Sequence, residues 1–160
     1  KMKYDSNVVS MQVSLANLKR KWAIQNLDIE IQISQGARTA ETEVEREIMN
    51  YSRNSSNRRK FFMHILRGTY QDNAITASQL VQEIGCALRT VETIIKECDE
   101  ANWVEIYKCN KGHRHIKAMP ILMETYENYT HWLWEAVEQT GLRRLGYAVS
   151  ELQRQVDEEC

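Results

Sequence analysis

The stretch of sequence that decides the fold runs from Thr76 to Val104 and is TASQLVQEIGCALRTVETIIKECDEANWV. It begins with a capping box, because the hydroxyl of Thr76 can accept a hydrogen bond from the amide of Gln79, whose side chain can reach back to the amide of Thr76. Gly85 can take the left-handed backbone conformation that ends a short helix, and a second helix opens after Ala87. The segment therefore predicts two helices joined by a tight turn.

The second of these helices has two chemically different faces. One face is apolar at helical spacing, through Val91, Ile94, Ile95 and Cys98. Polar and basic side chains lie on or beside the other face, and they are Arg89, Thr90, Thr93 and Lys96. We therefore expect the apolar face to pack against a core and the polar face to remain available to a partner.

A β-hairpin is expected directly after the second helix. Asn102 suits the left-handed position just past a helix end, and residues 103–109 are rich in aromatic and β-branched side chains. Residues 110–112 (Asn-Lys-Gly) supply turn chemistry, and residues 113–119 alternate again between apolar and polar. The pattern predicts a two-stranded hairpin with a basic tip.

Helices are expected on both sides of this unit. Arg58 begins an amphipathic stretch that fades at residues 71–73, and Pro120 begins another that lasts until the break at Gly141. Beyond Gly141, apolar residues recur at spacings of three and four, and they are Leu142, Leu145, Val149, Leu152 and Val156. Such a heptad stripe suits the pairing of helices.

The N-terminal third is less clearly patterned. Met11, Leu15, Leu18 and Trp22 form a helical stripe, whereas residues 27–33 also alternate as a half-buried strand would. We favour a continuous helix that stops near Gly36. Further along, Thr42 and Glu45 suggest a capping box for a short helix that ends before residues 52–57, which we interpret as a loop.

The order helix, short helix, tight turn, longer helix, hairpin and helix is that of a winged helix-turn-helix. Residues 76–104 resemble the DNA-binding core of MarR-type bacterial regulators, and the local match covers residues 60–120. The resemblance implies a mainly α fold with a two-stranded β wing, and N- and C-terminal helices that form a homodimer. It also implies a sequence-specific transcriptional regulator that occludes a promoter by binding a pseudo-palindromic operator in double-stranded DNA.

This interpretation assigns roles to three segments of one compact domain. Residues 1–54 and 121–160 are expected to dimerise, and residues 55–120 are expected to bind DNA. The dimer contacts are assigned to the heptad stripe, namely Leu142, Leu145, Val149, Leu152 and Val156. The resemblance further implies a small aromatic effector that binds between the dimerisation helices and the winged core and alters the spacing of the two recognition helices.

The winged core contains three groups of candidate DNA contacts. On the recognition helix they are Arg89, Thr90, Thr93 and Lys96, with Arg89 suited to a bidentate contact with guanine. On the wing they are Lys111, His113 and Arg114, and candidate phosphate contacts are Arg58, Arg59, Lys60, Thr76 and Ser78. Each of these groups can also be explained as an ordinary solvated surface. Glu92 and Glu97 on the same helix favour selective over generally strong affinity for DNA.

The charge distribution supports a local basic site. The whole chain has a net charge of −1, but residues 55–75 and residues 103–120 each carry four basic side chains and one acidic one. Residues 121–160 carry eight acidic and three basic side chains. A neutral chain with basic central segments indicates a local electrostatic partner rather than a field over the whole molecule.

Composition and motifs exclude several classes of protein. The 160 residues, 42 % of them hydrophobic, suffice for one domain with a buried core. Apolar runs do not exceed three residues, so we expect no membrane span and a cytoplasmic protein. The sequence has no Gly-rich phosphate loop, GxSxG or HExxH, so we expect neither an enzyme nor a cofactor.

Cysteine, histidine and aromatic residues leave some alternatives open. Four cysteines without a CxxC pair indicate reduced thiols, and Cys86 and Cys98 are interpreted as core residues. Cys109, His113 and His115 lack an obvious fourth ligand, so no metal site is expected. Aromatic residues before Gly141 are expected to pack in the core or a dimer interface, namely Tyr126, Tyr129, His131, Trp132 and Trp134.

Two alternative functions follow from the same residues. A winged helix can serve as a protein-interaction module, or act in replication or phage assembly, without reading DNA sequence. Cys109 makes a thiol or metal sensor a third class.

Overall fold

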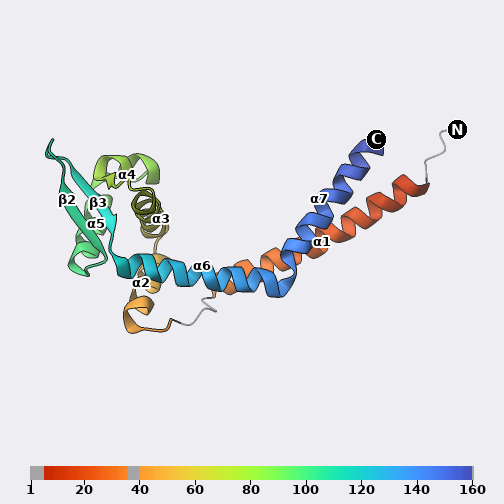
Figure 1. The fold of residues 1–160 in the computed structure, drawn as a ribbon, viewed down its shortest axis with the longest axis horizontal. Coiled ribbons are helices and arrows are strands. Elements are labelled where there is room, and N and C mark those ends of the chain that lie inside the picture. The colour runs from red at the N-terminus through yellow and green to blue at the C-terminus, as the bar shows by residue number, and fades with distance from the viewer. Residues whose placement is uncertain (1–5, 36–39, 160) are drawn as a thin grey trace. The chain divides into compact units, whose positions relative to one another are not determined.

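A computed structural model describes residues 6–35 and 40–159 (Figure 1). The described residues form seven α-helices and three β-strands. In chain order they are α1 (Ser6–Ser34), α2 (Glu43–Arg53), α3 (Ser56–Tyr70), β1 (Ile75–Thr76), α4 (Ala77–Ile84), α5 (Leu88–Glu100), β2 (Val104–Lys108), β3 (Arg114–Ala118), α6 (Pro120–Thr140) and α7 (Leu142–Glu159). Two compact units result, one of residues 39–129 and one of residues 1–38 with 130–160. The expected division of roles at residues 54 and 120 stays a prediction.

The helix-turn-helix of the first unit forms as its sequence predicts. The Thr76 hydroxyl accepts a hydrogen bond from the Gln79 amide at 3.3 Å, and the Gln79 side chain accepts one from the Thr76 amide at 2.9 Å. Gly85 ends α4 with a φ of 76°, and Asn102 follows α5 with a φ of 60°. The capping box, the turn and the left-handed position after α5 are therefore confirmed.

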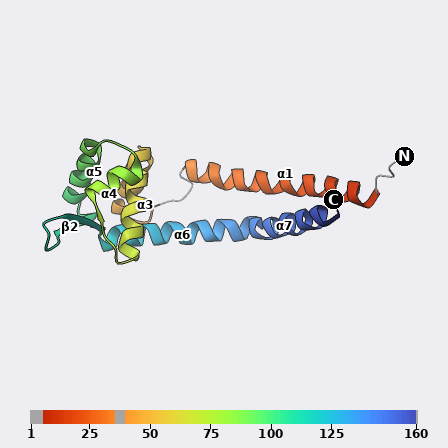
Figure 2. The same cartoon turned by 90° about the horizontal axis from the view of Figure 1, so that it is seen from above.

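The sheet has one strand more than the expected hairpin. β2 and β3 pair antiparallel, with Ile106 opposite Ile116, and the short β1 pairs with the other edge of β3 through Ile75 and Ile116. The order is β1-β3-β2, and β2, α4 and α5 of this unit are marked in Figure 2. Only two residues of β1 take part, which is too few for an alternating pattern to show in the sequence.

One hydrophobic core joins the sheet to α3, α4 and α5. Its most deeply buried side chains include Phe61, Ile65, Leu80, Ile95 and Ile116, all 2 % exposed or less. Cys98 is buried in this core, so its expected core role is confirmed, whereas Cys86 is only partly buried and packs against the edge of the core. The core fixes α5 by its apolar face and leaves the opposite face at the surface.

Two local expectations near α2 need correction. Thr42 caps α2 as expected, accepting a hydrogen bond from the Glu45 amide. The expected loop at residues 52–57 is wrong, because α2 continues to Arg53 and α3 already begins at Ser56. Ser55 allows this short connection, since its hydroxyl accepts from the Arg58 amide and caps α3.

The second unit contains the long helices α1 and α7, which pack against each other (Figures 1 and 2). The strand alternative for residues 27–33 is wrong, because α1 is helical through Ser34. Leu15 of α1 is buried together with Val149 and Val156 of α7, and Lys19 donates to the side-chain oxygen of Gln153 at 2.7 Å. Part of the heptad stripe of α7 is therefore covered by α1 of the same chain.

The helix α1 is apolar on two opposite faces. The face against α7 includes Met11, Leu15 and Leu18. The opposite face carries a second stripe, which we call the outer stripe, with side chains 42–57 % exposed, and it consists of Val9, Val13, Ile24, Leu27 and Ile31. A helix that is apolar on two sides is typical of a helix with partners on two sides.

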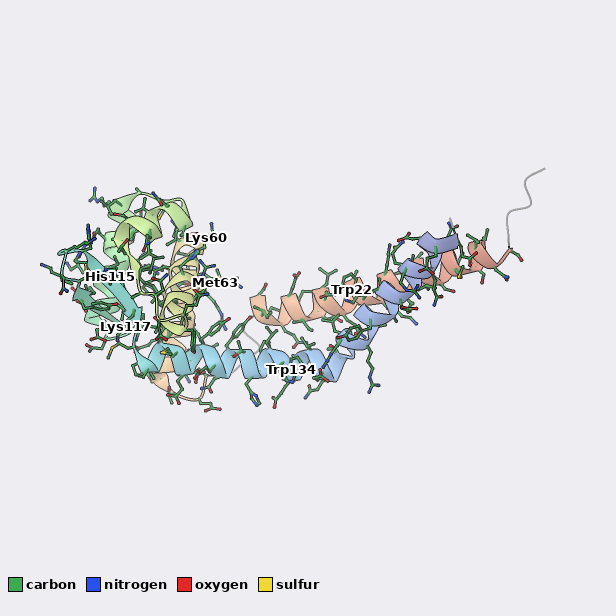
Figure 3. All side chains as sticks on the ribbon, turned by 45° about the horizontal axis from the view of Figure 1, so that its top comes forward. Trp22, Lys60, Met63, His115, Lys117 and Trp134 are labelled. Atoms are coloured by element: carbon green, nitrogen blue, oxygen red, sulfur yellow. The ribbon has the colours of Figure 1, made fainter. Side chains whose placement is uncertain are left out.

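The aromatic residues of α6 lie partly at the surface. Tyr126 is 40 % exposed and Trp134 is 55 % exposed, so the expectation of core packing is wrong for these two residues. The guanidinium of Arg143 lies 5.7 Å from the centre of the Trp134 ring, and Figure 3 shows Trp134 on its helix. The alternative, a dimer interface, stays a prediction.

Within the described residues, no helix is both long and apolar enough to cross a membrane.

Candidate nucleic-acid interface

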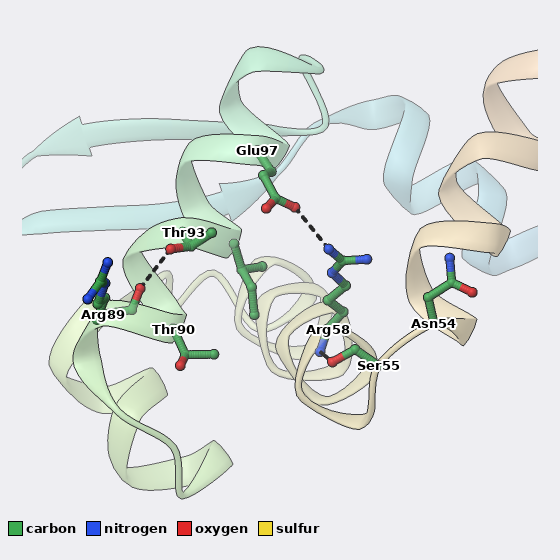
Figure 4. A pocket seen from close by; sticks show the side chains of 8 residues that line it. Asn54, Ser55, Arg58, Arg89, Thr90, Thr93 and Glu97 are labelled. Carbon is green, nitrogen blue, oxygen red and sulfur yellow. Dashed lines mark hydrogen bonds and ion pairs between the residues drawn. The ribbon is translucent and has the colours of Figure 1, made fainter.

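The exposed face of α5 presents a short row of polar and basic side chains. Arg89, Thr93 and Lys96 are all exposed and follow one another at helical spacings of four and three, and we call them the α5 row. The Thr93 hydroxyl donates to the Arg89 carbonyl at 2.9 Å (Figure 4). The Nζ atom of Lys96 lies 3.9 Å from the carboxylate of Glu100, the last residue of α5. The row can therefore meet a partner without any change in the core.

A shallow pocket of about 440 Å³ lies between α5 and the start of α3 (Figure 4). Thr90 is half-buried at this side of α5, so it lines the pocket instead of standing on the exposed face. The other lining residues are Asn54, Ser55, Arg58, Arg89, Thr93, Ile94 and Glu97. Hydroxyl, amide and guanidinium groups predominate, and these are the groups that contact a nucleic-acid backbone.

Arg58 is already engaged within the protein. Its guanidinium lies 3.4 Å from the carboxylate of Glu97 and 4.2 Å from the centre of the Tyr51 ring. The neighbouring Arg59 and Lys60 are exposed on α3, and Figure 3 shows Lys60 on this helix. The three basic residues expected to contact phosphates therefore differ in availability. Arg59 and Lys60 are exposed to solvent, whereas Arg58 is paired with Glu97.

The wing borders the opposite side of α5. Arg114, the first residue of β3, forms an ion pair with Glu92 of α5. Lys111 and His113 are exposed in the turn, where Gly112 has a φ of 80° and donates its amide to the Cys109 carbonyl at 2.8 Å. The basic tip of the hairpin is thus present, and its arginine is held against α5.

Thr76 and Ser78 lie at the start of α4. The Thr76 side chain is used as the helix cap, whereas Ser78 is exposed. Of the two hydroxyl groups, only that of Ser78 is not used to cap α4.

Cys109 and His115 interact near the tip of the wing. A hydrogen bond from His115 lowers the pKa of the Cys109 thiol, and the same contact raises the pKa of His115. The His115 ring is also stacked on Tyr107 at 5.4 Å, and its Nδ1 lies 3.2 Å from the carbonyl oxygen of Ala74. In residues 6–35 and 40–159, no group of three or more His, Cys, Asp or Glu side chains is arranged to hold a metal ion.

Sequence reasoning missed the two ion pairs that border the α5 row. Arg114 is 22 residues from Glu92 and Arg58 is 39 residues from Glu97, so no helical spacing connects either pair. The available signal was the presence of Glu92 and Glu97 beside the polar face of a helix expected to bind an anion. The structure shows that each acid has an arginine from a neighbouring element.

These features define a winged helix-turn-helix, with α4 and α5 as its two helices and β2 and β3 as its wing. The fold is similar to that of MepR, a transcription regulator of the Staphylococcus aureus multidrug efflux pump MepA. The TM-score is 0.51 at 12 % sequence identity, over 86 % of this chain and 95 % of that chain. The expected winged helix-turn-helix fold is therefore confirmed.

Two further solved structures match over most of their length. A complex of Staphylococcus aureus MepR with DNA has a TM-score of 0.42 and 10 % identity, over 91 % of this chain and 96 % of that chain. The MarR family transcription regulator SP03579 has a TM-score of 0.44 and 17 % identity, over 94 % of this chain and 99 % of that chain. Neither a family model nor a curated protein sequence matches the chain.

Proposed function

We propose that this protein is a cytoplasmic, sequence-specific DNA-binding transcriptional regulator that acts as a homodimer. The observation that carries the proposal is the α5 row, which is exposed on a helix held rigidly by its apolar face. The wing borders this helix on one side and α3 on the other. Likeness of fold to MepR, a transcription regulator, supports the same function.

The chemistry of the α5 row suits base recognition in the major groove. An α-helix fits this groove, and residues near its N-terminal end reach the base edges. Arg89 lies in the first turn of α5 and can bind the O6 and N7 atoms of guanine in a bidentate manner. Thr93 follows one turn later, where its methyl group can contact a thymine methyl. Lys96 and the turn residues Lys111 and His113 are suited to phosphates.

The outer stripe of α1 supports the homodimer. Five aliphatic side chains, each more than two-fifths exposed, lie along one face of this helix. The expected contact through α7 is less favoured, because Val149 and Val156 are already buried against Leu15. A second copy of the chain would cover the outer stripe and remove its apolar surface from water.

A dimer would present two α5 helices to one duplex. The helices would enter successive major grooves of a pseudo-palindrome whose half-sites are about 10 bp apart. A small aromatic effector would act by changing the distance between them, and a bound dimer would block access to a promoter.

Selection from a randomised duplex library at near-physiological salt tests the DNA-binding part. We expect enrichment of an inverted repeat, and Arg89→Ala should weaken binding to it by about 1–3 kcal/mol while relaxing one base position. Arg46→Ala is the matched control, since Arg46 is exposed on α2 and pairs with Glu43 of the same helix. No enrichment by a folded dimer would contradict sequence readout and favour a protein-interaction module.

Molar mass in solution, from light scattering, tests the dimer. Leu27→Lys places a charge in the outer stripe and should convert the dimer to a monomer. Gln32→Lys adds the same charge at an exposed position of α1 outside the stripe and should leave the mass unchanged. A dimer that survives Leu27→Lys would contradict the assignment of this surface.

A further inference from the structure

Two ion pairs border the α5 row, one on each side. Glu92 pairs with Arg114 at the start of the wing strand β3. Glu97 pairs with Arg58 of α3 at 3.4 Å. Each acid belongs to α5 and each arginine belongs to the element that lies beside it. The α5 row itself contains no acidic residue.

All four side chains remain accessible to solvent. Their exposed fractions are 39 % for Glu92, 41 % for Arg114, 37 % for Glu97 and 31 % for Arg58. Ion pairs at such positions are screened by salt and contribute little to folding stability. An incoming anion can therefore displace either carboxylate without disturbing the core.

A phosphate is a suitable replacement for each carboxylate. Arginine binds carboxylate and phosphate through the same fork of N–H donors. When a helix lies in a major groove, a sugar-phosphate backbone runs along each of its sides, so phosphates approach the borders of the α5 row. Arg58 is held at its border by the Tyr51 ring, 4.2 Å from the guanidinium, as well as by Glu97.

When a phosphate displaces Glu92 or Glu97 from its arginine, the carboxylate is left next to that phosphate. Once Arg114 or Arg58 turns to the DNA backbone, Glu92 or Glu97 loses its arginine and faces another negative charge. Like charges brought together at an interface oppose association. This opposition is the same for every DNA sequence, because the backbone is the same.

We propose that Glu92 and Glu97 occupy Arg114 and Arg58 as internal substitutes for phosphate and thereby lower the affinity of the protein for every duplex. They weaken binding to any nucleic-acid backbone, so a duplex is retained only when its bases also satisfy the α5 row. The claim that a duplex is retained only when its bases satisfy the α5 row rests on the proposed function. The claim that Glu92 and Glu97 keep Arg114 and Arg58 from binding polyanions does not depend on it.

The test uses the full chain with Glu92→Gln, Glu97→Gln and the double variant. Glutamine keeps the size of the side chain and removes its charge. Glu124→Gln is the matched control, because Glu124 is exposed on α6 and its substitution removes the same charge at a position away from α5. Two quantities are measured for each variant: the salt concentration of elution from heparin, and the affinity for a random-sequence duplex between 50 and 200 mM salt, a range over which phosphate contacts change affinity strongly.

We expect each single variant to bind the random duplex about threefold to tenfold more tightly than the control variant, in line with the release of one partly exposed charge. The slope of log affinity against log salt should become steeper by about 0.9 for each phosphate gained. Elution from heparin should require more salt. The affinity for the operator should rise by the same factor, because the opposition to phosphate is the same for both duplexes.

A second substitution assigns the gain to the released arginine. Glu92→Gln combined with Arg114→Gln should lose the increase seen with Glu92→Gln alone. Heparin elution and random-duplex affinity equal to those of Glu124→Gln would overturn the proposal, as would a gain that persists without Arg114. Folding of each variant is followed by circular dichroism, and the Glu97 variant tests the same mechanism independently at the other border.

The outcomes separate this inference from the proposed function. If the wild-type chain selects no DNA sequence but Glu92→Gln still elutes later from heparin than the control, sequence-specific regulation fails and the withholding of arginine stands. If the wild-type chain selects an operator and the variants match the control, the function stands and this inference fails.

Discussion

Thr69 connects helix α3 to the wing by one hydroxyl group. Its Oγ1 accepts a hydrogen bond from the Ala118 amide at 2.8 Å and donates to the Ile65 carbonyl at 2.8 Å. Ala118 is 3 % exposed, and β1 pairs only with residues 115 and 116 of β3. The Thr69 hydroxyl therefore takes the place of a strand partner for the last amide of β3.

Thr69→Val removes the hydroxyl and keeps the shape of the side chain. The Ala118 amide would then be buried without an acceptor, which costs about 1–3 kcal/mol of folding free energy. For a chain of this length the cost corresponds to a decrease in Tm of roughly 2–12 °C, at about 2–4 °C per kcal/mol. Thr69→Ser keeps the acceptor and should recover most of the loss.

Urea unfolding and hydrogen exchange of the Ala118 amide measure this effect. Thr125→Val is the matched control, since the Thr125 hydroxyl only donates to the Ile121 carbonyl, at 2.8 Å, and its loss leaves no buried donor unpaired. We expect the control to change stability much less. Equal stability of Thr69→Val and wild type, with unchanged exchange at Ala118, would refute the argument that this hydroxyl holds the wing.

Two further predictions concern the same unit. Gly68→Ala would place a methyl carbon 2.8 Å from the backbone oxygen of Asn73 and should destabilise the fold by about 1–3 kcal/mol, measured by urea unfolding. At neutral pH, iodoacetamide should modify Cys109 before Cys98, because His115 lowers the pKa of the Cys109 thiol whereas burial raises that of Cys98 to about 12. His115→Gln should move the alkylation of Cys109 to higher pH, as followed by mass spectrometry, and an unchanged pH profile would contradict the role of the histidine.

Short-range chemistry made the helix-turn-helix predictable. The capping box at Thr76, the glycine at position 85 and the asparagine at position 102 each specify a backbone conformation through atoms within a few residues. The apolar face of α5 was predictable for the same reason, since its spacing follows from helix geometry alone. The same geometry places the candidate residues Arg89, Thr93 and Lys96 on the opposite, solvent-exposed face of the helix.

Failures of the sequence interpretation have more than one physical cause. The favoured helix over residues 27–33 is confirmed, whereas the loop at residues 52–57 was wrong and strand β1 was missed. The cap at Ser55 that shortens the connection before α3 is a local contact with the Arg58 amide, whereas β1 depends on the edge of β3, about 40 residues further along the chain.

The sequence by itself determined the order of the elements and the face of α5 that stays at the surface, because periodicity and caps act over one or two helical turns. Only the tertiary structure decided which charges on that face are available. Arg58 and Arg114 appear in the sequence as free cations, and folding brings each of them to an acid of α5. Charge pairing across distant segments depends on distances that folding alone creates, so no local pattern encodes it.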